Sequence, residues 1–147
     1  MKHINQRRYA YIPYPFRPEN PKKPGNVRRN GCCLCSACMV VDQLTTEKFS
    51  VREAVDLALS VEANHATGTD IMILGPAVAE KFNLEFQPTD DIDEAIEAVR
   101  DGGRVIVRVS NRYECNKGIF TKTGHYMVII AATLPLLPKS KRRDDHA

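Results

Sequence analysis

Apolar residues recur at helical spacing in several stretches of the chain, and these stretches predict helices. The first covers 33–44, where Cys, Ala, Met, Val and Leu predominate and indicate a buried helix. The second covers 51–61 and is preceded by Ser50, with Glu53 three residues later. Ser followed at this spacing by Glu is the pattern of a capping box, so we expect the second helix to begin directly after Ser50.

A third helical region is predicted after the polar loop that follows the second helix. Thr69 or Asp70 can cap a turn over 71–74, because short polar side chains accept hydrogen bonds from free backbone N–H groups. Gly75-Pro76 follows and is expected to break or restart the helix. Proline suits the first turn of a helix, so a second piece is expected to begin here and to end near Phe82.

A last helix is predicted over 92–99, with Asp90 and Asp93 at its start and Gly102-Gly103 at its end. The two glycines mark a helix stop. They do not resemble a phosphate-binding loop, because no Gly-Lys-Ser or Gly-Lys-Thr follows them.

Strand patterns come after most of the helices. Alternation predicts a short strand at 84–86, and β-branched residues predict longer strands at 104–109 and 124–131. Prolines after Thr133 exclude a further central strand there, since proline cannot donate to the ladder. Helices followed by strands predict an α+β domain.

The first 31 residues contain five prolines and are expected to be extended or irregular. Their apolar side chains can bury area against the domain surface or, less favourably, form a polyproline-type ligand for another protein. These side chains are Tyr9, Tyr11, Ile12, Tyr14 and Phe16.

The charge distribution divides the chain of 147 residues into three parts. Residues 1–31 form a basic, proline-rich arm, 32–138 a single acidic domain, and 139–147 a charged tail expected to be disordered. We expect the arm to lie over its own acidic domain and do not expect a nucleic-acid partner. The sequence has neither an apolar run of membrane-spanning length nor a secretory signal pattern, which predicts a cytoplasmic location.

Five cysteines, four of them within Cys32–Cys38, do not form a disulfide framework, and we expect reduced thiols. Cys32 lies where the Asn30-Gly31 turn meets the first helix. The positive end of a helix and its free N–H groups favour a thiolate and can stabilise an oxyanion. Cys32 is therefore a candidate nucleophile, and His125, at the start of the last strand, is the candidate base.

These motifs and their order resemble papain-fold cysteine peptidases, in particular the bacterial branch that removes double-glycine leaders from bacteriocins. That branch has a GCGPTSLAMVL-type segment at the nucleophile, a GTD element, and GHYVVI at the base. The corresponding residues here are 31–41, Gly68-Thr69-Asp70 and 124–129, and the resemblance covers about 26–132.

The resemblance implies a papain-like fold in which Cys32 attacks a scissile carbonyl and His125 transfers the proton, through an acyl-enzyme. It implies a peptide or protein substrate and leaves export from the cell open. We expect neither a cofactor nor a metal. Papain-like enzymes have a glutamine six residues before the cysteine, and its oxyanion role would pass here to Asn26, with Asn30 as the rival.

The chain departs from the family pattern at three places. Cys33-Leu34 replaces Gly-Pro, Asn26 replaces glutamine, and no strand carrying an orienting Asp or Asn follows Ala132. The alternative function is therefore an inactive peptidase-like domain that binds a peptide or leader without cutting it. The last strands of the fold are expected to be missing through truncation or degeneration, and the His125 strand is then expected to offer an unpaired edge for self-association.

Two Cys-x-x-Cys pairs leave a metal site as a third possibility. Helical continuity favours instead that Cys33, Cys35 and Cys38 pack in the core. His3, His65 and His146 lie in predicted arm, loop and tail segments and receive no role.

Overall fold

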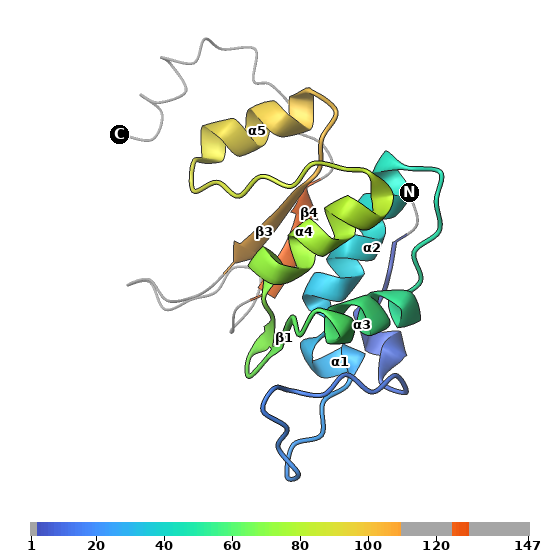
Figure 1. Ribbon diagram of the computed structural model, residues 1–147. Coiled ribbons are helices and arrows are strands. Elements are labelled where there is room, and N and C mark those ends of the chain that lie inside the picture. The colour runs from blue at the N-terminus through green and yellow to red at the C-terminus, as the bar shows by residue number, and fades with distance from the viewer. Residues whose placement is uncertain (1–2, 110–124, 130–147) are drawn as a thin grey trace.

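The computed structural model describes residues 3–109 and 125–129 (Figure 1). Within these ranges the elements are η1 (Gln6–Tyr9), α1 (Val27–Asn30), α2 (Cys32–Leu44), α3 (Val51–Ser60), β1 (Asn64–His65), β2 (Gly68–Thr69), α4 (Ile71–Phe82), α5 (Ile92–Arg100), β3 (Val105–Val109) and β4 (His125–Ile129). Helices combined with small antiparallel sheets confirm the α+β class. In the described part of the chain, no helix is both long and apolar enough to cross a membrane.

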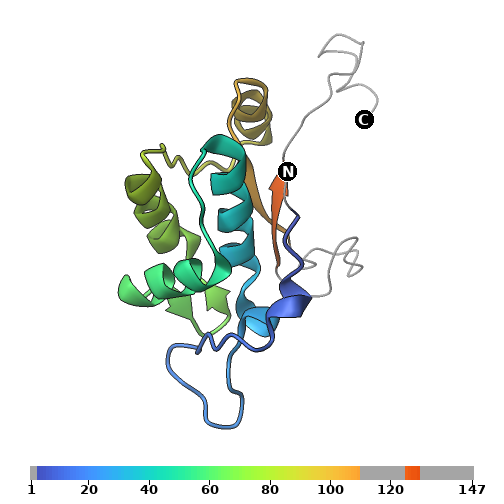
Figure 2. The same ribbon diagram turned by 90° about the vertical axis from the view of Figure 1, so that its right-hand side faces the viewer.

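Helix α2 lies at the centre of the molecule and contacts α3, α4 and β4. Figure 2 shows α3 and α4 on one side of α2, and β4 with the N-terminal arm on the other. The side chains of α2 from Cys33 to Cys38 are all buried, as is Val41. A helix enclosed on several sides must be apolar around most of its circumference, which explains the composition that predicted it.

The N-terminal arm belongs to this core. Ile12 and Tyr14 are 3% and 0% exposed and lie in the same cluster of buried residues as α2. The Tyr14 N–H donates to the Gly25 carbonyl at 3.1 Å, and the Val27 N–H donates to the Ile12 carbonyl at 3.1 Å. The prediction that apolar side chains of the arm pack against the domain is therefore confirmed for Ile12 and Tyr14, whereas Tyr11 is 65% exposed.

The arm also ends in regular structure that the sequence did not predict. Residues 27–30 form the short helix α1, whose N-cap is Asn26, with its side chain accepting from the Arg29 N–H at 2.9 Å. The irregular conformation expected for the whole of residues 1–31 is thus wrong for this turn. The last proline is Pro24, so none of the residues in the turn lacks a donor.

The predicted helix starts are largely confirmed. Ser50 Oγ accepts from the Glu53 N–H at 3.1 Å, and Glu53 Oε1 accepts from the Ser50 N–H at 3.2 Å, which completes the capping box. Asp70 caps α4 by accepting from the Met72 N–H at 2.9 Å. Helix α5 begins at Ile92, as predicted, although its N-cap is Asp91 and not Asp90.

Two predictions between residues 71 and 86 are wrong. Helix α4 continues through Gly75-Pro76 without a break. Proline at this position removes one backbone donor, and the remaining hydrogen bonds and the burial of Leu74 and Val78 hold the helix together. Residues 84–86 form no strand, because the Leu84 N–H donates to the Ala79 carbonyl at 2.8 Å and the Phe86 ring packs directly on Gly75.

Residues 64–69 were expected to be a loop, but they contain the short antiparallel pair β1–β2. The larger antiparallel pair is β3–β4, in which Val105 faces Ile129 and Val109 faces His125. Both strands were predicted. The residues that would carry any following strand and the charged tail lie outside the described part of the chain.

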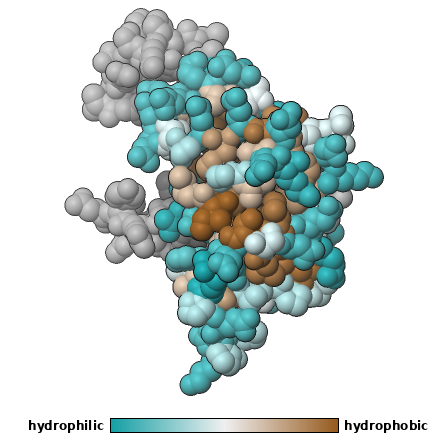
Figure 3. Space-filling view, viewed as in Figure 1, coloured by the Kyte–Doolittle hydropathy of each residue, from teal (hydrophilic) through white to brown (hydrophobic). Residues whose placement is uncertain are grey.

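One face of the molecule carries a hydrophobic patch. Leu59 near the end of α3 and Met72 and Ile73 at the start of α4 are exposed by 37%, 54% and 37%. Figure 3 shows hydrophobic colour in this part of the surface, surrounded by hydrophilic residues.

Candidate functional site

Cys32 is the first residue of α2 and follows a sharp change of chain direction. Gly31 separates α1 from α2 and has φ −99° and ψ 14°. Its N–H donates to the Val27 carbonyl at 2.9 Å, and its own carbonyl accepts from the Cys35 N–H at 3.0 Å. A Cβ at Gly31 would lie 2.6 Å from the Val27 carbonyl oxygen, so glycine is required for this approach.

Strand β4 passes the same end of α2. The Tyr126 backbone forms a hydrogen bond with the thiol of Cys32, and Ser36 Oγ donates to the Tyr126 carbonyl at 3.5 Å. The fold therefore brings the backbone of the residue after His125 against Cys32, across more than ninety positions of sequence. The imidazole of His125 lies outside the described part of the structure.

The environment of Cys32 does not favour its thiolate, contrary to the expectation from the helix end. Burial raises the pKa of the Cys32 thiol above its usual range. Backbone hydrogen bonds from Tyr126, Cys33 and Cys32 itself act in the opposite direction and do not overcome burial. Desolvation is the largest effect because burial disfavours the charged form of the thiol.

The two candidate oxyanion residues are both engaged in structural hydrogen bonds. Asn26 caps α1 through its side-chain oxygen. Asn30 is 5% exposed, and its Nδ2 donates to the Tyr14 carbonyl at 3.0 Å, while its Oδ1 is buried without a hydrogen-bond partner. Each amide thus holds the backbone that leads into Cys32, and the oxyanion role stays a prediction.

A buried hydrogen bond beside the cysteines was not predicted. Tyr14 Oη and Thr69 Oγ1 are 2.6 Å apart, and both side chains are buried. Burial raises the pKa of Tyr14 to about 12, and the nearby sulfurs of Cys33 and Cys32 contribute to the shift. The signal in the sequence was Thr69 in the Gly68-Thr69-Asp70 element, whose partner could not be identified from sequence alone.

Further hydrogen bonds join the arm to the β1–β2 pair and to the residues before it. Asn64 Nδ2 donates to the Pro15 carbonyl at 3.0 Å, and Arg17 Nε donates to the Asn64 carbonyl at 3.1 Å. Arg17 Nη2 also donates to the Glu62 carbonyl at 2.9 Å. The arm, the β1–β2 pair and the start of α2 therefore form one hydrogen-bonded unit around the cysteines.

The other cysteines of α2 are core residues. Cys33, Cys35 and Cys38 are 0%, 3% and 1% exposed, and burial raises the pKa of each thiol, that of Cys35 to about 12. Within residues 3–109 and 125–129, no three His, Cys, Asp or Glu side chains are grouped as metal ligands. The arrangement suits packing within a regular helix.

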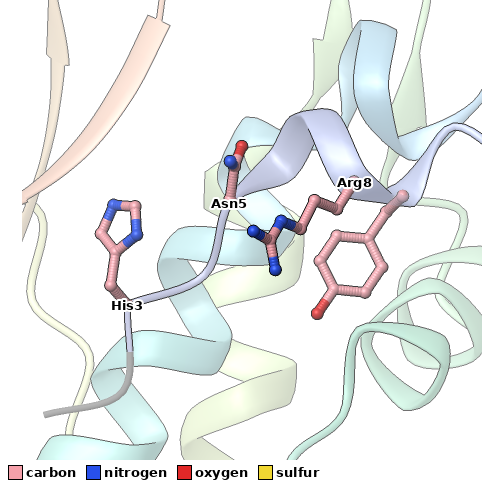
Figure 4. Close-up of a pocket in the computed structure, with 4 residues that line it drawn as sticks. His3, Asn5 and Arg8 are labelled. Carbon is pink, nitrogen blue, oxygen red and sulfur yellow. The ribbon is translucent and has the colours of Figure 1, made fainter.

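Two surface hollows border the N-terminal arm. One, of about 340 Å³, is lined by His3, Asn5, Arg8 and Tyr9, and Figure 4 shows that they come from one short stretch of chain. The other, of about 510 Å³, lies between the arm and the α2–α3 connection, with Ile12, Cys38 and Phe49 among its lining residues. Cys32 lines neither hollow.

No family model, no curated protein and no solved structure matches this chain. The resemblance to papain-fold peptidases therefore rests on the sequence motifs.

Proposed function

We propose that this chain is a papain-like thiol hydrolase that cleaves a peptide bond, with Cys32 as nucleophile and His125 as general base. The observation that supports the proposal is the hydrogen bond between the Tyr126 backbone and the Cys32 thiol. His125 is the neighbouring residue on β4, so its backbone lies at the same end of α2 as the thiol. A nucleophile with a base at hydrogen-bonding range is the minimum requirement for acyl transfer.

The reaction would proceed in two steps. His125 takes the proton of the Cys32 thiol, and the sulfur gives an electron pair to the carbonyl carbon of the substrate. The carbonyl electrons move to oxygen, where backbone N–H groups at the start of α2 can stabilise the charge. The tetrahedral intermediate expels the amine, which takes the proton from His125. Water then attacks the acyl-enzyme with His125 as base and releases the acid and the thiol.

Such a role requires the imidazole to offset the effect of burial on the thiol. Burial raises the pKa of Cys32, whereas an adjacent imidazolium stabilises the thiolate and lowers the pKa. The reactivity of Cys32 at neutral pH therefore reports whether His125 lowers the pKa of the Cys32 thiol.

The test is the rate of alkylation of the native protein by iodoacetamide, measured at Cys32 by mass spectrometry between pH 6 and 10. We expect the wild type to react at neutral pH and His125→Ala to react at least ~10-fold more slowly there, in line with the effect of general bases. Tyr126→Phe is the matched control, because it changes the neighbouring side chain and keeps the backbone bond. Equal rates in the wild type and His125→Ala would exclude the dyad.

A second candidate, an inactive peptidase-like domain that binds a peptide, is favoured by the raised pKa of Cys32. A thiol that stays protonated at neutral pH is a poor nucleophile. Fluorescent peptides ending in Gly-Gly distinguish the two functions when binding and cleavage are measured together. Binding with neither cleavage nor a trapped acyl-enzyme selects the second candidate, and an acyl-enzyme on Cys32 excludes it.

A further inference from the structure

The first turn of α2 contains two cysteines that differ in exposure. Cys32 is half-buried, and Cys35, three residues later, is 3% exposed. The Cys35 N–H donates to the Gly31 carbonyl at 3.0 Å, so both residues belong to a closed helical turn. Residues at this spacing in a helix have Cα atoms about 5 Å apart, which lies within the range of disulfides.

The two sulfurs also influence one another. Burial is the main cause of the raised pKa of Cys35, and the charge of Cys32 is the second. The charge of Cys32 also raises the pKa of Cys33, so this effect agrees with neighbouring thiols in the first turn, and the helical spacing is what pairs Cys32 with Cys35.

We propose that Cys32 and Cys35 form a site of thiol–disulfide exchange that closes reversibly to a disulfide on reaction with a low-molecular-weight disulfide such as oxidised glutathione. Cys32 is the attacking thiol because it is the more exposed of the two, and Cys35 is the resolving thiol. The exchange does not depend on the proposed hydrolysis. If Cys32 is also the nucleophile of the hydrolase, the closed form is inactive.

The exchange with glutathione disulfide takes place in two steps. The thiolate of Cys32 attacks one sulfur of glutathione disulfide, the S–S bond breaks, and one glutathione leaves as thiolate. The thiolate of Cys35 then attacks the sulfur of Cys32, and the second glutathione leaves. Two protein thiols are oxidised, one glutathione disulfide is reduced to two glutathiones, and the protons pass to the leaving thiolates.

The start of the helix is the place where this closure is possible. Neighbouring side chains on a helix have Cβ atoms about 5–6 Å apart, and a disulfide needs roughly 3.5–4.5 Å, so the turn must tighten. Cys32 is the first residue of the helix and no side chain caps this end, so a small movement of Cys32 disturbs fewer contacts than one inside the helix. Cys35 and Cys38 have the same spacing but lie within the helix, both buried, where such a movement would disturb the core.

The experiment incubates the reduced full-length protein with oxidised glutathione, quenches with acid, unfolds the protein and alkylates the free thiols. We expect a mass two hydrogens below that of the reduced chain before alkylation, and alkylation at only three of the five cysteines afterwards. Tryptic fragmentation of the peptide that contains α2 should give no backbone cleavage products between Cys32 and Cys35 before reduction.

The variants separate the resolving thiol from the other buried thiols. Cys35→Ala should stop at a glutathione adduct on Cys32, whereas Cys38→Ala, a buried cysteine of the same helix, should still form the disulfide. A persistent glutathione adduct on Cys32 in the wild type, closure between another pair of cysteines, or no oxidation at all would overturn the proposal. The wild-type protein alone shows whether the Cys32–Cys35 disulfide forms, even if Cys35→Ala does not fold. An unchanged alkylation rate in His125→Ala would contradict the proposed hydrolase function and leave the proposed thiol–disulfide exchange standing.

Discussion

The chemistry of Cys32 depends on two opposing effects at a single sulfur atom. A helix start and three backbone hydrogen bonds stabilise the thiolate, and burial destabilises it by a larger amount. The sequence revealed the first effect, since it follows from the position at the helix end. The second depends on which segments cover the sulfur, and these come from residues far away in the chain.

The hydrogen bond between Tyr14 and Thr69 provides a test of the buried unit beside Cys32. We expect Tyr14→Phe and Thr69→Val each to lower the free energy of unfolding by about 1–3 kcal/mol, because each leaves the other hydroxyl buried without its partner. The double variant should be less destabilised than the sum of the two. Urea unfolding of the four proteins gives the coupling energy, and strict additivity would show that the two hydroxyls do not interact.

The extent to which the site could be predicted differs from residue to residue. Cys32 at the helix start and the strand beginning at His125 were both recognisable, because glycine, thiol and apolar periodicity are local signals. Tyr14 was expected only to pack, and its hydroxyl partner Thr69 is 55 residues away. A contact of that kind is set by tertiary packing, which no local pattern encodes.

At the scale of elements, Gly31 determines where α2 begins. The chain turns from α1 into α2 at this residue, and the close approach to the Val27 carbonyl leaves no room for a side chain. Asn30-Gly31 was interpreted as a loop signal, whereas Asn30 ends a helical turn and Gly31 links two helices. The same kind of error applies to Gly75-Pro76, where tertiary packing keeps α4 continuous in spite of a helix-breaking dipeptide.

Gly31→Ala is expected to lower the free energy of unfolding by about 1–3 kcal/mol, because the new Cβ would overlap with backbone atoms of Val27. The measurement is urea unfolding, with the alkylation rate of Cys32 as a second observable. Gly75→Ala is the matched control. Its new Cβ meets the ring of Phe86, a side chain of an irregular segment that can move aside, so the loss should be smaller. An equal or larger loss in Gly75→Ala would contradict this account of Gly31.

At the scale of the whole molecule, one core joins the arm to the helices. The cluster of buried residues contains Ile12 and Tyr14 from the arm and most of α2. Charge and proline content place a boundary at residue 31, but the arm before it and the helices after it share one hydrophobic core. Charge and proline describe the surface and backbone of a segment, whereas the few aromatic residues in it determine what it is packed against.

This core contains ionisable groups that are held neutral, and it should therefore weaken at alkaline pH. Burial raises the pKa of Cys35 from 9.0 to about 12 and that of Tyr14 from 10.0 to about 12, and it also raises the pKa of Cys33 and Cys38. In the unfolded chain these groups lose their protons near pH 9–10, while the folded protein keeps them. The unfolded state then binds fewer protons, so the free energy of unfolding falls as pH rises.

The contribution of these groups should be fully present below about pH 9 and should be lost progressively towards pH 12. Each buried thiol that stays protonated adds a slope of up to about −1.4 kcal/mol per pH unit in this window. Urea unfolding of the reduced protein at pH 8, 9.5 and 10.5 measures the fall. Cys38→Ala removes one such group, so its stability should fall less steeply with pH than that of the wild type, whatever its stability at pH 8. A free energy of unfolding that is constant or rises over this range would show that the thiols and Tyr14 are not held neutral by the core.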